Sequence, residues 1–373
     1  MWRGLAFVRF TLTRGGATVP VCNGGKADVM FRSKNAQRRL NAGLVAAILF
    51  FSPSGTLAFE GNLAPEIGAR TGDYSPFVGR AYPDQVLFGD LHFHTKLSFD
   101  AGLVGTSLSV HDAFRVARGE KIISNTGQPV QLIRPLEFLA ITEHAEFLGV
   151  ATALKGSDPR LLGNEAGRRI YHQFNAGQEG RMAAFADIIE MATVKGVDPF
   201  ADLGLADSIW TDLLPVIDEY NDPGTFTTLA GFEWTFTPKG DNLHRIVLFR
   251  DDADTTGKVR PLSFFDAPDP ELLWDYLAAY EKSTGGRAIA VPHNANMSNG
   301  LMFSDRMFNG KPITRAYAAK RSRWEPMHEM TQIKGDEETH PLLSPDDEFA
   351  NFETWDVGNL SGTAPKTSEM LQY

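Results

Sequence analysis

The stretch Phe88-Gly-Asp-Leu-His-Phe-His-Thr-Lys-Leu-Ser-Phe-Asp100 places two histidines two residues apart behind an apolar run. Residues 86–88 are apolar and favour β structure, so the stretch predicts a strand. Side chains two apart on a strand share a face, and we expect His92 and His94 to point the same way, with Asp90 before them on that face. Two neutral imidazoles on one face can bind one metal ion. An isolated pair of this kind is also typical of surface histidines, so the metal interpretation depends on residues further along the chain.

The composition excludes several classes of protein and of site. The chain has 373 residues, of which 43% are hydrophobic, and this is enough for one large domain or two ordinary ones. Its formal net charge of −10 argues against a protein that binds a nucleic-acid polymer. The single cysteine, Cys22, rules out a disulfide within the chain and a cysteine-rich zinc site. A metal ion would need His, Asp and Glu ligands, which suit Zn²⁺, Mn²⁺ or Fe²⁺.

Residues 1–58 differ from the rest of the chain and resemble a signal peptide with an upstream extension. Four basic residues between positions 32 and 39 precede the apolar run 42–51, and small and turn-forming residues follow up to Ala58. The apolar run is too short to span a bilayer comfortably, so no stable membrane anchor is expected. We therefore expect a periplasmic or secreted protein, with a disordered tail as the alternative. Residues 59–84 read as an irregular lead-in, and residues 85–373 as one domain.

The remaining pattern alternates strands with helices, as βαβ units do. Helices are expected at 107–120, over the long polar stretch 161–194, at 207–220 with an interruption at Pro215, and at 270–282. A hairpin is expected within 121–134. Core strands are expected at 138–142, 226–236, 243–249 and 287–291, and two later ones at 326–333 and 351–357.

Several residues that can bind metal lie at or just beyond the C-terminal ends of these strands. Besides His92 and His94, they are His144, Glu233 and His293. In a β/α barrel the carboxyl ends of the strands form one face, where active sites assemble. His244 is less regular, because it begins its apolar run instead of ending it. Each residue alone is more often an ordinary hydrogen-bonded group, but their common placement indicates a metal cluster.

These motifs resemble those of the PHP superfamily, named for polymerase and histidinol phosphatase. The matching segments are Asp90-Leu-His-Phe-His-Thr95, Thr142-Glu-His144, Gly231-Phe-Glu233, the lone His244 and Pro292-His293. The chain is most similar to the PHP-like domain-of-unknown-function family 3604, from residue 85 onward. Residues 334–338 resemble a later motif of that family, with a solvated acidic loop as the alternative.

The resemblance implies a distorted (β/α)₇ barrel that binds two or three divalent metal ions. By their positions in the motifs, the ligands would be seven residues: His92, His94, Asp100, His144, Glu233, His244 and His293. Asp100 stands where many relatives have His, and Glu143 replaces the usual Asp, which leaves Glu143 a supporting role.

A cluster of this composition suits the hydrolysis of a small-molecule phosphoester by metal-activated water. Glu233 would bridge two ions, and Arg245 would hold a phosphate oxygen unless it is an ordinary ion-paired arginine. Two alternatives remain open at this point. One is another metal-dependent hydrolase that cleaves an ester or amide, and the other is a PHP-like module that binds a ligand without turnover.

The end of the sequence adds one further expectation. Relatives supply a final Asp-x-His pair, but after His293 this chain has only His328 and His340, neither in that context. It also stops at Tyr373 inside a helix-like run. These features predict a member truncated at its C-terminus, with an incomplete barrel and metal site, which could be inactive.

Overall fold

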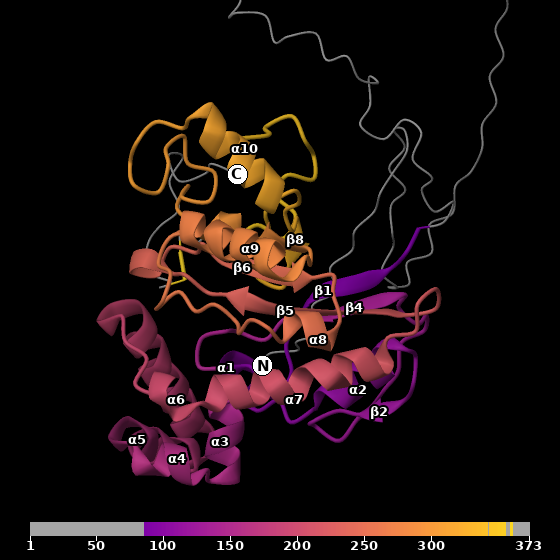
Figure 1. Ribbon diagram of the computed structural model, residues 1–373, viewed down its shortest axis with the longest axis vertical. Helices are drawn as coiled ribbons and strands as arrows, with labels where there is room; N and C mark the ends of the chain where they lie inside the picture. The colour runs from indigo at the N-terminus through magenta and orange to yellow at the C-terminus, as the bar shows by residue number, and fades with distance from the viewer. Residues whose placement is uncertain (1–85, 342, 356–358, 361–373) are drawn as a thin grey trace, which may run out of the picture. The chain divides into compact units, whose positions relative to one another are not determined.

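The computed structural model describes residues 86–341, 343–355 and 359–360, and its main sheet has five strands. They are β1 (Gly89–Phe93), β4 (Phe138–Ile141), β5 (Thr227–Trp234), β6 (Arg245–Phe249) and β7 (Ala288–Pro292). The strands are hydrogen-bonded in the order in which they occur along the chain. The fold is mixed α/β, and its sheet curls into a half-barrel (Figure 1). Each of these strands lies where the sequence predicts one.

Strand β6 runs against both of its neighbours. β1, β4 and β5 are parallel, whereas β6 is antiparallel to β5 and to β7. The connection from β5 to β6 contains only the 3₁₀ turn η3 (Pro238–Gly240), so no helix crosses over between them. The expected alternation of strands and helices is therefore wrong at this point. Because of the reversal, β6 begins at the end of the sheet where β5 finishes, and the first residue of β6, Arg245, pairs with the last residue of β5, Trp234.

Three amphipathic helices pack with the sheet into the larger apolar core: α2 (Val110–Ala117), α7 (Leu205–Tyr220) and α9 (Pro270–Thr284). Two reciprocal hydrogen bonds fix the start of α2. The Ser109 side chain accepts from the Asp112 backbone N–H, and the Asp112 carboxylate accepts from the Ser109 backbone N–H. Helix α7 continues through Pro215, where the sequence predicts an interruption. Proline removes a backbone hydrogen bond, but the burial of Trp210 and Leu213 on the same helix holds α7 against the core.

Residues 150–203 form a group of short helices with a second apolar core (Figure 1). It contains α3 (Val150–Gly156), α4 (Pro159–Gly163), α5 (Glu165–Phe174), α6 (Gly177–Glu190), the π turn η1 (Met191–Lys195) and the 3₁₀ turn η2 (Ala201–Leu203). The expected long helical region is thus broken, because Asn164 caps α5 and Gly177 has a positive φ of 89°. The group packs on α1 (Phe99–Val104) through Phe99 and Leu103.

A small apolar cluster supports the face of the sheet that carries the candidate ligands. It includes Ile246 and Val291. Ile246 lies two residues after His244, and Val291 two residues before His293, so each shares a face with that histidine. The buried residues of this cluster come from β1, β4, β6 and β7 and form an apolar layer beneath the polar residues.

The remaining expectations have mixed outcomes. The hairpin is confirmed by β2 (Ile122–Ile123) and β3 (Pro129–Val130). Of the strand expected at 326–333, only the two-residue β8 (Thr331–Gln332) forms, and it pairs with β9 (Gly335–Asp336) just after that range. The short helices α8 (Ala253–Thr256) and α10 (Arg315–Trp324) were not expected. Residues 351–353 form a turn, and 356–358 lie outside the described residues, as do the signal-like segment and the lead-in up to residue 84. The seven-stranded barrel stays a prediction.

Candidate metal centre

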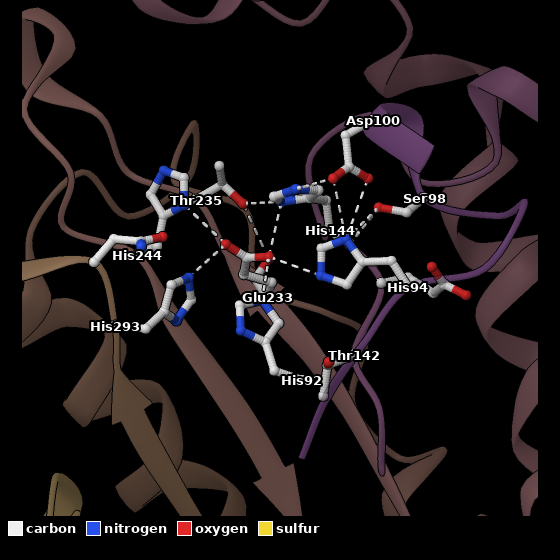
Figure 2. Close-up of polar contacts among 12 residues, drawn as sticks. His92, His94, Ser98, Asp100, Thr142, His144, Glu233, Thr235, His244 and His293 are labelled. Atoms are coloured by element: carbon white, nitrogen blue, oxygen red, sulfur yellow. Dashed lines mark hydrogen bonds and ion pairs between the residues drawn. The ribbon is translucent and has the colours of Figure 1, made fainter. Parts of the chain in front are cut away.

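The carboxylate of Glu233 lies at the centre of the candidate site. Glu233 is the penultimate residue of β5, and its side chain is 2% exposed. Imidazole nitrogens lie within 3.4 Å of its two oxygens, and they belong to His92, His94, His144, His244 and His293 (Figure 2). Burial by itself would raise the pKa of Glu233, but His144 and His293 outweigh this effect and hold the pKa well below its usual range. The structure thus brings the five predicted histidines to one carboxylate.

Two histidines contact one oxygen of this carboxylate. Glu233 Oε1 lies 2.8 Å from His244 Nδ1 and 2.9 Å from His293 Nε2. His244 precedes β6 and His293 follows β7, and the antiparallel register brings both to the edge where β5 ends. Thr237 Oγ1 lies 2.8 Å from His244 Nε2 and fixes the orientation of that ring. Burial lowers the pKa of His244 to about 4 and that of His293 to about 3, so both rings are neutral near pH 7 and can act as ligands.

The other three histidines contact the second oxygen. Glu233 Oε2 lies 3.0 Å from His94 Nε2, 3.2 Å from His92 Nε2 and 3.4 Å from His144 Nδ1. The rings of His92 and His94 are 5.1 Å apart, which agrees with a shared face. Asp90 does not join them: the register of β1 shifts between Asp90 and Phe93, and Asp90 Oδ1 instead accepts from the His92 backbone N–H at 2.8 Å.

Asp100 extends the site beyond Glu233. It lies in the first turn of α1, and its oxygens are 3.2 Å from His94 Nδ1 and 3.4 Å from His144 Nε2. His144 follows β4, and its Nδ1 lies 2.5 Å from Thr235 Oγ1. Phe99, beside Asp100, packs against the His144 ring at 4.7 Å. His94, Asp100 and His144 can therefore place one donor atom each around a single position.

Glu329 belongs to the site although the sequence did not single it out. It follows α10, is buried, and its Oε2 lies 2.9 Å from His92 Nδ1. Its backbone N–H donates to the Pro292 carbonyl, which anchors it beside the end of β7. Burial would lower the pKa of His92, but Glu329 and Glu233 outweigh it and raise that pKa to about 9. Glu329 is not part of an Asp-x-His pair, so the sequence motifs could not identify it. The only hint in the sequence is the adjacent His328.

Glu143 supports the site without joining it. Both of its oxygens face Thr95: the backbone N–H donates at 2.9 Å and the hydroxyl at 2.5 Å. This contact ties the segment after β1 to the segment after β4, and so fixes His94 relative to His144. A supporting role is what the sequence predicts for Glu143.

Arg245, the candidate phosphate-binding residue, is not brought to the cluster. Its side chain is 2% exposed, and Nε lies 2.9 Å from Glu325 Oε1. Its Nη1 donates to the Leu243 carbonyl, and its guanidinium lies over the Trp234 ring. Arg245 and His244 are consecutive on an extended segment, so their side chains leave on opposite faces. These contacts match the ion-paired alternative.

The acidic stretch 334–338 forms a packed turn beside the cluster. Glu337 is buried and accepts from Asn294 Nδ2 at 3.3 Å and from the Ala295 backbone N–H at 3.1 Å. Gly335 has a φ of 104°, and a Cβ there would meet the Glu353 carbonyl at 2.7 Å, so this turn requires glycine. The solvated-loop alternative is wrong for Glu337.

The donor set fits metal ions. Four groups of three residues each place one ligand atom within 4.8 Å of the others. They are His92–His94–Glu233, His92–His293–Glu329, His94–Asp100–His144 and Glu233–His244–His293. Imidazoles crowded around carboxylates in a buried space are the arrangement that a cation stabilises. These residues could therefore hold metal ions.

A family model described as "Protein of unknown function (DUF3604)" matches residues 81–373. The match covers most of the chain, and the chain belongs to this family. No curated protein and no solved structure shows a significant match to this chain. Within the described ranges, none of the helices is long and apolar enough to cross a membrane.

Proposed function

We propose that the chain is a metal-dependent hydrolase, most simply a phosphoesterase that uses metal-activated water. The observation that carries the proposal is the division of contacts at Glu233. One oxygen faces His244 and His293, and the other faces His92, His94 and His144. A carboxylate with a separate set of imidazoles at each oxygen is suited to bridge two ions.

The ligands divide naturally between two ends. Glu233 Oε1, His244 and His293 would hold one ion, with His92 and Glu329 next to them. His94, Asp100 and His144 would hold another at the far side of the carboxylate, and the group His92–His94–Glu233 could hold a third. A set of His, Asp and Glu without cysteine suits Mn²⁺, Zn²⁺ or Fe²⁺.

Bound divalent ions would lower the pKa of a water molecule and polarise the ester that it attacks. The chain's own contribution is to hold the donors in place. Thr237 and Thr235 orient the rings of His244 and His144, and Glu143 fixes the segment that carries His94. The apolar layer beneath the cluster keeps water away from that side, which strengthens the electrostatic interactions above it.

The fold proposal is a PHP-type (β/α)₇ barrel. Its support is the half-barrel sheet, whose candidate ligands all lie at one edge, as in a barrel enzyme. Glu329 adds a carboxylate after β7, the region where the resemblance predicts missing ligands. This favours turnover over the alternative of a binding module, because the site has a buried acid at that position.

The test combines metal analysis with hydrolysis. Purified protein should contain two or three transition-metal ions per chain and should cleave p-nitrophenyl phosphate or bis(p-nitrophenyl) phosphate after Mn²⁺ or Zn²⁺ is added. p-Nitrophenyl acetate, tested in parallel, distinguishes an ester hydrolase.

The His94→Ala variant should lose both metal and turnover, because His94 contacts both Glu233 and Asp100. His111→Ala is the matched control, since that ring lies on α2 and contacts Tyr220 instead. Undiminished turnover in His94→Ala, or in excess chelator, would refute the proposal. Bound metal without turnover of any of the three esters would leave the binding module as the better explanation.

A further inference from the structure

A hollow of about 250 Å³ lies beside the metal centre but outside it. Its lining is partly apolar, from Phe303, Met327 and Pro292, and partly polar, from Arg321, His328 and the Glu325 carboxylate that pairs with Arg321. The rings of Phe303 and His328 pack against each other at 5.0 Å.

The hollow adjoins two candidate ligands along the chain. Pro292, in its wall, precedes His293, and His328 precedes Glu329. The Glu329 backbone N–H also donates to the Pro292 carbonyl, so both walls meet at this hydrogen bond. A molecule in the hollow would therefore lie next to one end of the metal centre.

The charged groups behind the hollow centre on Glu325. Glu325 Oε1 lies 2.9 Å from Arg245 Nε, and Glu325 Oε2 lies 3.0 Å from Arg321 Nε. Trp274 Nε1 donates to the same carboxylate at 2.8 Å. Two guanidinium groups thus share one carboxylate. Of two other buried acids beside the wall residue His328, Glu329 contacts His92, and Glu337 Oε2 lies 3.5 Å from His328 Nε2. The second guanidinium group is therefore available to form a charge-assisted hydrogen bond with an anion.

Arg321 is the guanidinium that faces the hollow. It is partly accessible, with its side chain 20% exposed, whereas Arg245 is buried. Nε is engaged by Glu325, and Nη2 donates to the Met302 carbonyl at 2.8 Å. Among the described residues, Nη1 makes no hydrogen bond. The guanidinium lies 5.2 Å from the centre of the Phe303 ring, which fixes its plane.

We propose that this hollow is a subsite for a small oxyanion, such as a carboxylate, carried on an apolar body. The oxyanion pairs with Arg321, while the apolar body lies against Phe303 and Met327. As the place for the unreactive end of a substrate, the subsite rests on the proposed function. Its ability to bind such an anion does not, and can be measured without turnover.

Benzoate is a suitable probe, and the indole N–H of Trp274 is a suitable reporter because it donates to Glu325. The chain has six tryptophans, so Trp274→Phe assigns the signal in a two-dimensional ¹H–¹⁵N spectrum. Titration of benzoate into the full chain, loaded with Zn²⁺ or treated with EDTA, should shift this signal saturably in both states. Persistence in EDTA distinguishes the hollow from the metal ions as the binding place.

Arg321→Met should weaken benzoate binding about tenfold, the effect of losing one charge-assisted hydrogen bond. It leaves Arg245 and Glu325 as a one-to-one pair, which favours a folded product. Arg323→Met is the matched control, because Arg323 lies on the same helix but pairs with Glu281 at the surface. Met327→Asp, at a partly exposed wall position, provides a second variant and should weaken binding by charge repulsion.

Three results would overturn the proposal. They are the absence of a saturable shift, equal binding by Arg321→Met and Arg323→Met, and binding that disappears in EDTA. Tighter binding of inorganic phosphate than of benzoate in the EDTA-treated protein would also overturn it, because the apolar wall would then add nothing. Failure of the hydrolysis assays would leave these measurements unaffected.

Discussion

Glu233 Oε1 and His244 Nδ1 lie 2.8 Å apart, although Glu233 is at the end of its strand and His244 precedes the start of the next. The antiparallel direction of β6 explains this, because it returns the chain to the edge that β5 has just reached. His244 begins its apolar run instead of ending it, and this is the position that an antiparallel strand needs to bring its side chain to the same end of the sheet as Glu233. Its contact with Glu233 defines one end of the proposed bridge.

Glu233→Gln should remove most of the bound metal. The amide keeps the shape of the side chain but loses the charge that faces the histidines, and its nitrogen cannot act as a ligand. Metal content per chain, measured by mass spectrometry of the purified protein, checks this. Glu143→Gln is the control, since an amide oxygen can still accept from Thr95, and it should keep its metal. Equal metal content in the two variants would contradict a bridging role for Glu233.

Glu329→Gln should lower the metal content by one ion, because Glu329 serves only the end of the site near His92 and His293. Glu337→Gln is a demanding control. Burial, reinforced by Glu329, raises the pKa of Glu337 well above its usual value, and its carboxylate accepts from Asn294 and Ala295 instead of contacting the five histidines. It should retain the full metal content. A full complement of ions in Glu329→Gln would show that this carboxylate is not a ligand.

The stabilisation that metal provides should grow as pH rises from 6.5 to about 9. In the metal-free protein the pKa of His92 is raised to about 9, so its contribution to stability is complete below pH 6.5 and is lost as pH rises through about 9. Metal must displace the same proton, so its affinity rises over this range. The difference in Tm with and without Zn²⁺ measures both effects. A difference that shrinks toward pH 9 would contradict the prediction.

Glu233 governs the acid side of the same profile. Its pKa is lowered, so its contribution to the metal-free protein is present above about pH 4.5 and is lost as pH falls further. The Tm of the metal-free protein should therefore fall as this contribution is lost below about pH 4.5.

Gly231→Ala should destabilise the fold by about 1–3 kcal/mol, as overpacking in a core does. A Cβ at this position of β5 would meet the Val247 carbonyl at 2.4 Å and Thr142 Cγ2 at 2.9 Å. Chemical denaturation measures the change. Gly156→Ala is the control at the end of α3, where a Cβ meets nothing within 4 Å, and it should be neutral or slightly stabilising. Equal stability of the two variants would contradict the close approach at Gly231.

Local patterns predicted the five core strands, because each is a short apolar run with a polar residue behind it. They also placed His92, His144 and Glu233 at one edge, since strand direction fixes where those side chains emerge. The direction of β6 could not be predicted in the same way, because it depends on how residues 235–244 fold back. This is a property of the connection and not of the strand.

Glu329 could not be predicted as a site residue either, because long-range contacts set its position. Its position depends on a hydrogen bond to Pro292 and on the packing of α10, which are contacts between distant parts of the chain. The role of Arg245 was equally ambiguous in sequence. An arginine beside a histidine fits a phosphate site or an ion pair, and only the position of Glu325 separates the two.

The ends of the cluster differ in how far they reach solvent: the side chains of Glu233 and His293 are 2% and 1% exposed, but that of Asp100 is 36% exposed. An ion held at Asp100 would exchange rapidly with the surrounding solution, whereas one at His293 could leave only when the protein opens locally. Brief contact with a weak chelator would then strip the outer position and spare the inner one. The metal count of a preparation would reflect its handling as much as the capacity of the chain.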